Sequence, residues 1–170
     1  MALKTISSDW HLVPSDTVEL EAVRKKCRRL VARRAAISAG MSAVPLPGLD
    51  VVTEIGMLTS LIDDINKEFG LTPAQIDRLN PQLRLAAYEV ILAMGSVMVG
   101  KIVTRALVAR LLQKLGVKML VKHTAKIVPI AGQVVSAALG FAAFRTIGNQ
   151  HIEACAKVAA QLVNLRPASA

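Results

Sequence analysis

Aromatic residues are scarce in this sequence and make up only 3% of the chain. They are Trp10, Phe69, Tyr88, Phe141 and Phe144. Proteins that bind nucleic acid by base stacking need aromatic platforms, so the scarcity argues against a nucleic-acid partner. It also removes the aromatic belt that flanks many membrane spans.

Cysteine and histidine are equally sparse. Cys27 and Cys155 stand far apart, with no C-x-x-C pair, which excludes a disulfide framework and a zinc-binding pair. The three histidines, His11, His123 and His151, lack any metal-ligand spacing. We therefore expect no metal site, and we expect both cysteines to be buried as small apolar residues.

Sequence motifs for catalysis are also missing. Residues 95–101 match the phosphate-binding pattern G-x-x-x-x-G-K, but Ile102 replaces the Ser or Thr that holds magnesium. Asp63 and Asp64 are adjacent and would point about 100° apart on a helix, which suits acid–base catalysis poorly. Asp50 is better explained as a helix cap. We expect no catalytic residue, no cofactor and no enzymatic activity.

Charge is low in amount and strongly biased in sign. Charged residues form 19% of the 170-residue chain, yet its net charge is +9 and 53% of it is hydrophobic. An apolar chain with excess positive charge suits an anionic surface. The alternative is a basic soluble protein with a large core.

The order of the chain predicts one helical domain. Residues 1–14 lack periodicity and are expected to form a loose arm, 15–165 a single domain, and 166–170 a tail. The N-terminus has no basic-then-apolar secretory signal, so we expect the protein to stay on the cytoplasmic side.

The spacing of apolar residues predicts an all-α fold of six to seven helices, because nothing alternates with period two. Helices are expected over 17–43 after an Asp16 cap, over 49–69 up to Gly70, briefly after Thr72, from Pro81 toward Leu115, and from an Asn149 cap onward. The expected inward residues are Val23, Cys27, Leu30, Val31, Ile37 and Met41; Ile55, Leu58, Leu61, Ile62 and Ile65; and Ile152, Cys155, Ala159 and Leu162.

A short phrase occurs twice, at 44–51 and 128–135, each time as Val-Pro-(Leu/Ile)-x-Gly-x-x-Val. Proline interrupts a helix and glycine allows a corner, so each copy predicts a helix–break–helix corner. The corner residues are Pro45, Pro47, Gly48 and Asp50 in the first copy, and Pro129 and Gly132 in the second. Two corners suggest two similar helical hairpins, although eight positions do not prove a duplication.

Two groups of cations are the candidate anion-binding residues. The first consists of Arg24, Lys25, Lys26, Arg28, Arg29, Arg33 and Arg34; the second of Arg110, Lys114, Lys118, Lys122 and Lys126. The second group recurs every four residues, in an interval from Glu89 to Glu153 that contains no acid between its ends. Like charges so placed repel each other on a helix, so an anionic partner is expected, with a solvated basic face as the alternative.

Two charge-free stretches accompany these cations, at 35–49 and 127–144. Both contain a proline corner and are short for the roughly 20 residues that span a bilayer, so we expect them to dip into a membrane or to form a core. Gly132, Ser136 and Gly140 share one helical face. Small residues so placed allow close helix packing and predict self-association.

The phrase Pro45-Leu46-Pro47-Gly48-Leu49-Asp50, the apolar helix after it, Phe69-Gly70-Leu71 and the later corner resemble the bacterial domain-of-unknown-function family 697. That family occurs alone or behind Era-like GTPase domains, often in membrane-associated proteins, and a similar phrase occurs in the helical domain of immunity-related GTPases. The resemblance covers roughly residues 34–145 and implies an all-helical bacterial membrane module without catalytic residues. This chain has no GTPase domain, so any GTPase would be a separate partner.

The expected function is a non-enzymatic module that engages the anionic cytoplasmic leaflet of the bacterial inner membrane, peripherally or partly embedded. Three alternatives remain open at this point. They are a soluble adaptor for a GTPase or another protein, a nucleic-acid binder, and a membrane-active toxin or its immunity protein.

Overall fold

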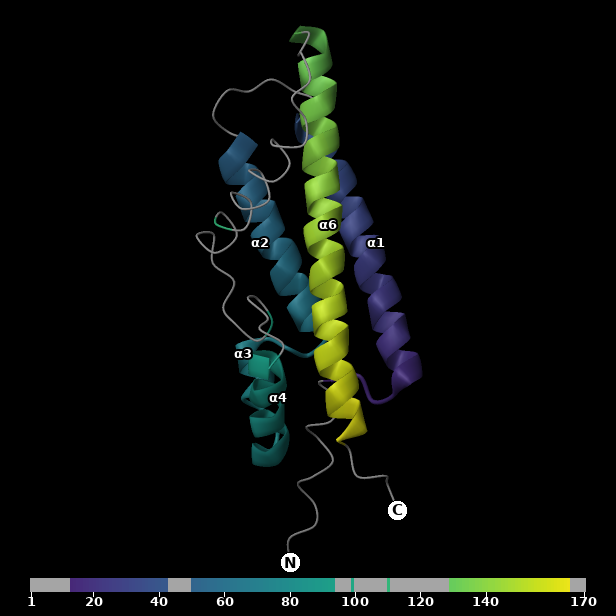
Figure 1. Cartoon of the computed structure of the whole chain (residues 1–170), viewed down its shortest axis with the longest axis vertical. Helices are drawn as coiled ribbons and strands as arrows, with labels where there is room; N and C mark the ends of the chain where they lie inside the picture. The colour runs from purple at the N-terminus through teal and green to yellow at the C-terminus, as the bar shows by residue number, and fades with distance from the viewer. Residues whose placement is uncertain (1–12, 43–49, 94–98, 100–109, 111–128, 166–170) are drawn as a thin grey trace, which may run out of the picture. The chain divides into compact units, whose positions relative to one another are not determined.

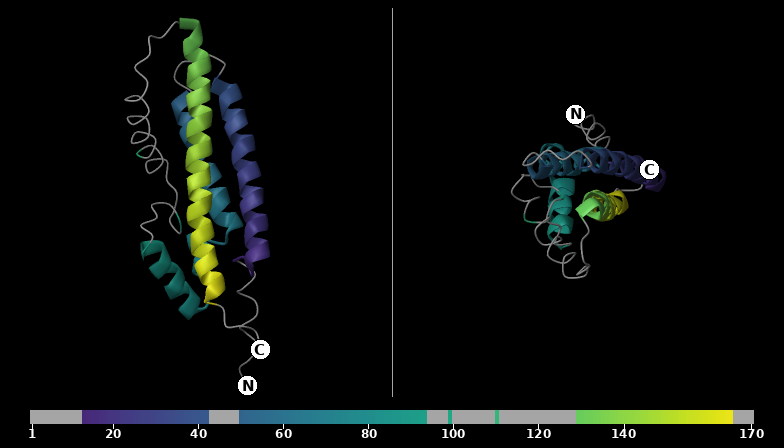
Figure 2. Two further views of the ribbon diagram at one scale, coloured as in Figure 1. Left: turned by 45° about the vertical axis from the view of Figure 1, so that its right-hand side comes forward. Right: turned by 90° about the horizontal axis from the view of Figure 1, so that it is seen from above.

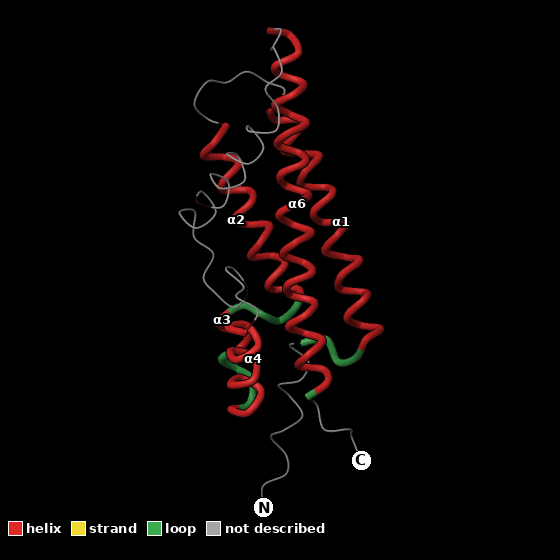
Figure 3. Tube along the Cα trace, in the orientation of Figure 1, coloured by secondary structure: helices red, strands yellow, loops and turns green. Residues whose placement is uncertain are grey.

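The computed structural model describes residues 13–42, 50–93, 99, 110 and 129–165. Every regular element within these ranges is a helix, and they contain no strand (Figure 3). The elements are α1 (Thr17–Ser42), α2 (Asp50–Glu68), α3 (Pro73–Ile76), α4 (Pro81–Ala93) and α6 (Pro129–Asn164) (Figure 1). The predicted all-α class is confirmed for this part of the chain, and the bounds of α1 and α2 agree with the expected ones within one residue.

The chain divides into two compact units, and the division falls inside α1, α2 and α6. Unit 1 comprises Met1–Arg28, Ile62–Ile102 and Gln150–Ala170, and unit 2 comprises Arg29–Leu61 and Val103–Asn149. Within each unit, segments of α1, α2 and α6 lie side by side (Figure 2). Each unit therefore brings together residues that are far apart in the sequence.

The core of unit 1 is mostly aliphatic and includes Phe69. Ile62, Ile65 and Phe69 are fully buried, as are Leu71 and Ile76 after the end of α2. The predicted inward stripe of the last helix is confirmed, because Ile152, Cys155, Ala159 and Leu162 are all buried. Val13 and Pro14, which the sequence places in the arm, are buried as well.

The core of unit 2 is built partly from small residues. Val31 and Ala35 of α1 are buried with Leu58 of α2 and Ile147 of α6. A Cβ atom added to Gly148 would lie 2.7 Å from Cγ2 of Val31, so the glycine allows α1 and α6 to approach closely. The predicted inward position of Ile37 is wrong: its side chain is 48% exposed, because Ala35 and Ser38 occupy the buried face of this turn.

The ends of the helices follow local sequence signals. Asp16 accepts a hydrogen bond from the Glu19 amide at 2.8 Å and caps α1. Gly70 ends α2 with a φ of 71°, in the left-handed region that favours glycine. Thr72 and Gln75 form a complete capping box at α3, and Asn80 caps α4 by accepting from the Leu83 amide at 2.9 Å.

In the second predicted corner the glycine does not break the helix, and the residues before Pro129, where a break would lie, are outside the described part of the chain. Pro129 is the first residue of α6, where its missing N–H costs nothing, and the helix continues through Gly132 without a break. Asn149 is an interior residue of the same helix rather than the cap of a new one. Gly148 is likewise an interior residue of α6, and it lies at the contact with Val31.

Several predictions fall on residues that the structure does not describe. These are the corner residues Pro45, Pro47 and Gly48, most of the arm, the tail, and most of the expected continuation of the fourth helix toward Leu115. Within that continuation two residues are described: Val99 lies in a turn and Arg110 is helical. Asp50 of the first corner is the first residue of α2. Among the described helices, none combines the length and apolarity needed to cross a membrane.

Candidate functional site

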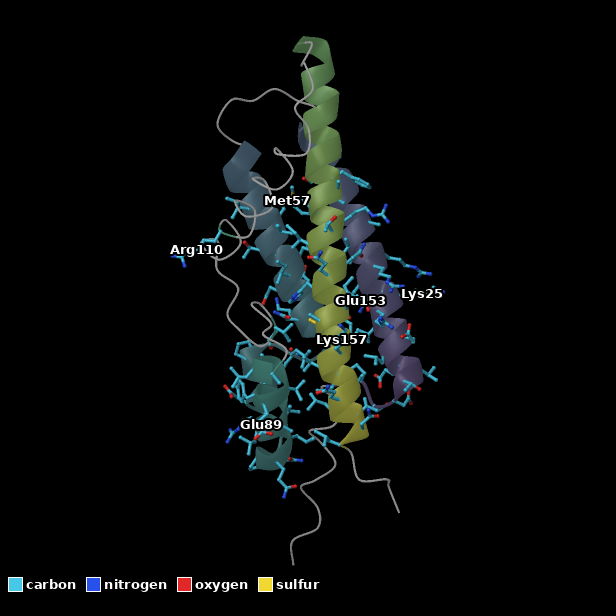
Figure 4. The ribbon with its side chains drawn as sticks, in the orientation of Figure 1. Lys25, Met57, Glu89, Arg110, Glu153 and Lys157 are labelled. Atoms are coloured by element: carbon cyan, nitrogen blue, oxygen red, sulfur yellow. The ribbon has the colours of Figure 1, made fainter. Side chains whose placement is uncertain are left out.

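The outer face of α1 carries most of the first cation group. Cys27, Val31, Ala35 and Ser38 define the buried side of the helix. At 100° per residue, the exposed residues Lys25, Arg29, Arg33 and Ile37 lie within an arc of about 120° on the opposite side. Figure 4 shows Lys25 on the side of α1 that points away from Glu153. The four residues recur at intervals of one helical turn.

Three cations of the group are held by carboxylates. Arg24 and Arg28 both donate to Glu153 of α6, with Arg28 Nη2 at 2.9 Å from its carboxylate, and Arg24 also pairs with Glu21. Lys26 Nζ lies 2.7 Å from the Glu68 carboxylate of α2. Burial acts to raise the pKa of Glu153, but the hydrogen bonds from Arg28 and Arg24 hold it below its ordinary value. These cations join neighbouring helices within unit 1.

Arg34, in unit 2, also faces a neighbouring helix, because its guanidinium donates to the Ser60 hydroxyl of α2 at 3.0 Å. Four of the seven predicted anion-binding residues of the first group, Arg24, Lys26, Arg28 and Arg34, are thus engaged within the protein.

Lys25, Arg29 and Arg33 form no ion pair with any described residue, and all three are exposed. Consecutive members lie four residues, or about 6 Å of helix axis, apart. Because like charges at this spacing repel each other, the arrangement is unfavourable unless an anion lies against it. We call these three residues the α1 stripe.

The residues around the α1 stripe are short. Ala22, Ala32 and Ala36 are exposed on the same side, and a Cβ at Gly40 would meet nothing within 4 Å. These short residues leave the side chains of Lys25, Arg29 and Arg33 prominent on this face, and the exposed acid nearest to them in the helix, Glu21, is paired with Arg24. Ile37 follows Arg33 after one turn and adds an exposed apolar side chain to the same face.

The second cation group is described only at Arg110, which is exposed. Lys114, Lys118, Lys122 and Lys126 lie outside the described residues, so the structure does not place them beside Arg110. Gly132, Ser136 and Gly140 all belong to α6, where their four-residue spacing puts them along one side of the helix.

A buried polar cluster lies in the core of unit 1 and was missed by sequence reasoning. Asn66 of α2 and His151 and Cys155 of α6 are almost fully buried. The Asn66 Oδ1 atom lies 2.9 Å from His151 Nε2 and 3.5 Å from Cys155 Sγ. Because a carboxamide oxygen only accepts, His151 donates through Nε2 and the thiol donates to the same oxygen.

The composition of this cluster resembles the Cys–His–Asn set of thiol enzymes, but its electrostatics are the reverse of what such chemistry needs. Burial lowers the pKa of His151 to about 4 and raises that of Cys155 well above its ordinary value. An active thiol needs a thiolate and a base with an available lone pair. Here Nε2 already carries the proton, so the cluster satisfies buried polar groups instead of activating sulfur.

One signal in the sequence indicates this cluster. His151 precedes Cys155 by four residues, so it shares the face that Cys155, Ala159 and Leu162 were expected to bury. A buried histidine needs a hydrogen-bond partner. The sequence does not reveal that Asn66, 85 residues away, supplies it.

The described residues contain no group of three or more His, Cys, Asp or Glu side chains that could hold a metal ion. No family model, no curated protein and no solved structure matches the chain. The geometry of the α1 stripe is therefore the main guide to function.

Proposed function

We propose that this protein is a non-enzymatic helical module that binds the anionic cytoplasmic leaflet of the bacterial inner membrane at its surface. The observation that carries the proposal is the α1 stripe, whose three exposed cations have no carboxylate partner in the described residues. The resemblance of the Pro-Gly phrase to a family of membrane-associated modules supports the same proposal.

The magnitude of the charge effect is sufficient for reversible binding. Each cation near an anionic membrane contributes about 1 kcal/mol, so three contribute about 3 kcal/mol, or roughly a hundredfold in partitioning. Arg110 and the four lysines that follow it would add to this attraction in the complete protein. The interaction weakens as salt screens the charges.

The exposed face of α1 favours lipid over nucleic acid. Phosphate of either kind would satisfy Lys25, Arg29 and Arg33, but Ile37 and the alanines beside them offer nothing to a sugar or a base. No aromatic residue lies on α1 for stacking. An apolar residue beside cations suits the boundary between head groups and acyl chains.

The complete chain, in this proposal, forms six to seven helices with two hairpins, and Gly132, Ser136 and Gly140 mediate self-association at the membrane. No metal or cofactor takes part, and a separate GTPase remains a candidate partner.

Flotation with lipid vesicles tests the proposal. The purified protein should float with vesicles containing phosphatidylglycerol, should ignore phosphatidylcholine vesicles, and should be released by high salt. Failure to float with either kind would reject the proposal. Tighter binding to duplex DNA or RNA in a gel shift at the same ionic strength would instead identify a nucleic-acid binder.

A second candidate, a soluble adaptor, is favoured by one observation on α4. Leu85 and Leu92 are 62% and 75% exposed and lie seven residues apart, on one side of the helix. Two exposed leucines so placed are typical of a helix that docks a protein partner. If the protein is an adaptor, a pull-down should recover a partner in stoichiometric amount, and Leu85→Glu should abolish the binding of that partner. The same substitution should leave vesicle flotation unchanged.

A further inference from the structure

The second half of α1 differs in chemistry from the first. After Arg34 the helix carries no charge through Ser42, and the charge-free sequence continues to Leu49. Among the residues of this half up to Gly40, the exposed ones are Ala36, Ile37 and Gly40. The outer face of α1 thus passes from basic to apolar within two turns.

Ile37 is the large side chain at this transition. It is 48% exposed, whereas the neighbouring large residues of unit 2, Val31 and Leu58, are fully buried. Arg33 lies one turn before it, about 40° around the helix, and Arg29 lies about 80° away. A flat surface that contacts the guanidinium groups of Arg29 and Arg33 therefore also contacts the side chain of Ile37.

We infer that α1 lies in the plane of an anionic lipid surface, with Arg29 and Arg33 on head-group phosphates and Ile37 inserted below them among the acyl chains. This inference rests on the proposed function and names the residue that enters the membrane.

Two features of unit 2 fit this orientation. Ala36 and Gly40 have little or no side chain, so the helix backbone can sink toward the phosphates without a clash. Arg34 points around the helix to Ser60 of α2, and this hydrogen bond helps to hold the opposite side of α1 against its neighbour. The helix can therefore present Arg29, Arg33 and Ile37 together while the other side stays packed.

Tryptophan fluorescence of the full chain tests the insertion. In a Trp10→Phe background, Ile37→Trp should show blue-shifted emission when phosphatidylglycerol vesicles are added, and brominated acyl chains should quench it. Leu85→Trp on α4 is the matched control, because it is also an exposed large apolar position, and it should show neither effect. Phosphatidylcholine vesicles should leave both spectra unchanged.

The outcomes separate this inference from the proposed function. Insertion through Ile37 is overturned, and surface binding stands, if the protein floats with anionic vesicles but the indole of the Ile37→Trp variant stays accessible to aqueous iodide. The same conclusion follows if the emission of the Leu85→Trp variant shifts equally. If nothing floats, both the insertion and the proposed function are overturned.

Truncation of the side chain gives an independent measurement. Ile37→Ala should weaken partitioning onto phosphatidylglycerol vesicles by about tenfold, whereas Ile37→Leu should not, because leucine keeps the apolar surface that enters the acyl chains. Equal partitioning of the two variants would also overturn the insertion.

Discussion

Single contacts in the two cores explain residues that local sequence patterns do not. Gly148 is a helix residue with poor intrinsic propensity, and it is retained where α6 meets Val31 of α1. His151 is a histidine on an apolar face, and it is satisfied by Asn66 of another helix. Both residues are fixed by partners that lie more than 80 positions away in the chain.

Gly148→Ala should lower the free energy of unfolding by about 1–3 kcal/mol, as overpacking in a core does. The added methyl group would lie 2.7–2.8 Å from both γ-methyl groups of Val31, and a β-branched side chain in a helix has little freedom to turn away. Urea unfolding followed by circular dichroism gives the measurement. Gly40→Ala is the matched control, and it should stabilise by up to about 1 kcal/mol, because that site is open. Equal effects of the two variants would show that the close approach is absent.

Acid should destabilise the protein through His151. The unfolded chain takes up the imidazole proton near pH 6.5, but the buried ring does so only near pH 4. The contribution of this group to stability is therefore constant above about pH 6.5 and falls by about 1.4 kcal/mol per pH unit as the pH drops toward 4. Urea unfolding at pH 7, 6 and 5 measures this slope.

His151→Gln is the control for this pH dependence, because its amide can still donate to Asn66 but does not titrate. In this variant the slope of the unfolding free energy against pH, between pH 6.5 and 5, should decrease by the contribution of one proton. An unchanged slope would assign the acid sensitivity to other groups.

Helix ends were predictable from the sequence, and helix contacts were not. The caps at Asp16, Thr72 and Asn80 and the end at Gly70 depend on residues within one turn of each other, so short patterns identify them. The outward position of Ile37 and the unbroken path of α6 through Asn149 depend on which neighbouring helix covers each face. Hydrophobic spacing alone does not contain that information.

The capping box before α3 allows the contribution of a single helix end to stability to be measured. Thr72→Ala removes the acceptor of the Gln75 amide and the partner of the Gln75 side chain, so it should destabilise the protein by about 1 kcal/mol. Thr72→Ser keeps the hydroxyl and should stay close to the wild type. Thermal unfolding of the three proteins measures the difference. A Ser variant as unstable as the Ala variant would mean that the methyl group, and not the cap, matters.

The net charge of the chain is +9, and the cations of α1 are of two kinds, those paired with carboxylates and those without such a partner in the described residues. Arg24, Lys26 and Arg28 pair with carboxylates on neighbouring helices. The α1 stripe neutralises nothing in the described part of the chain. The paired and the unpaired cations lie in one cluster of the sequence and could not be distinguished there. Ion pairs between distant residues form only when the helices pack together.

The partitioning of two charge-matched variants onto phosphatidylglycerol vesicles tests the central claim most directly. One variant carries Lys25→Gln, Arg29→Gln and Arg33→Gln in the α1 stripe. The other carries Arg78→Gln, Arg84→Gln and Lys157→Gln at exposed cations elsewhere. Both lose three positive charges. We predict that the first variant loses about a hundredfold in partitioning, about 1 kcal/mol per cation, while the second stays within a few-fold of the wild type. Equal losses in the two variants would contradict the account.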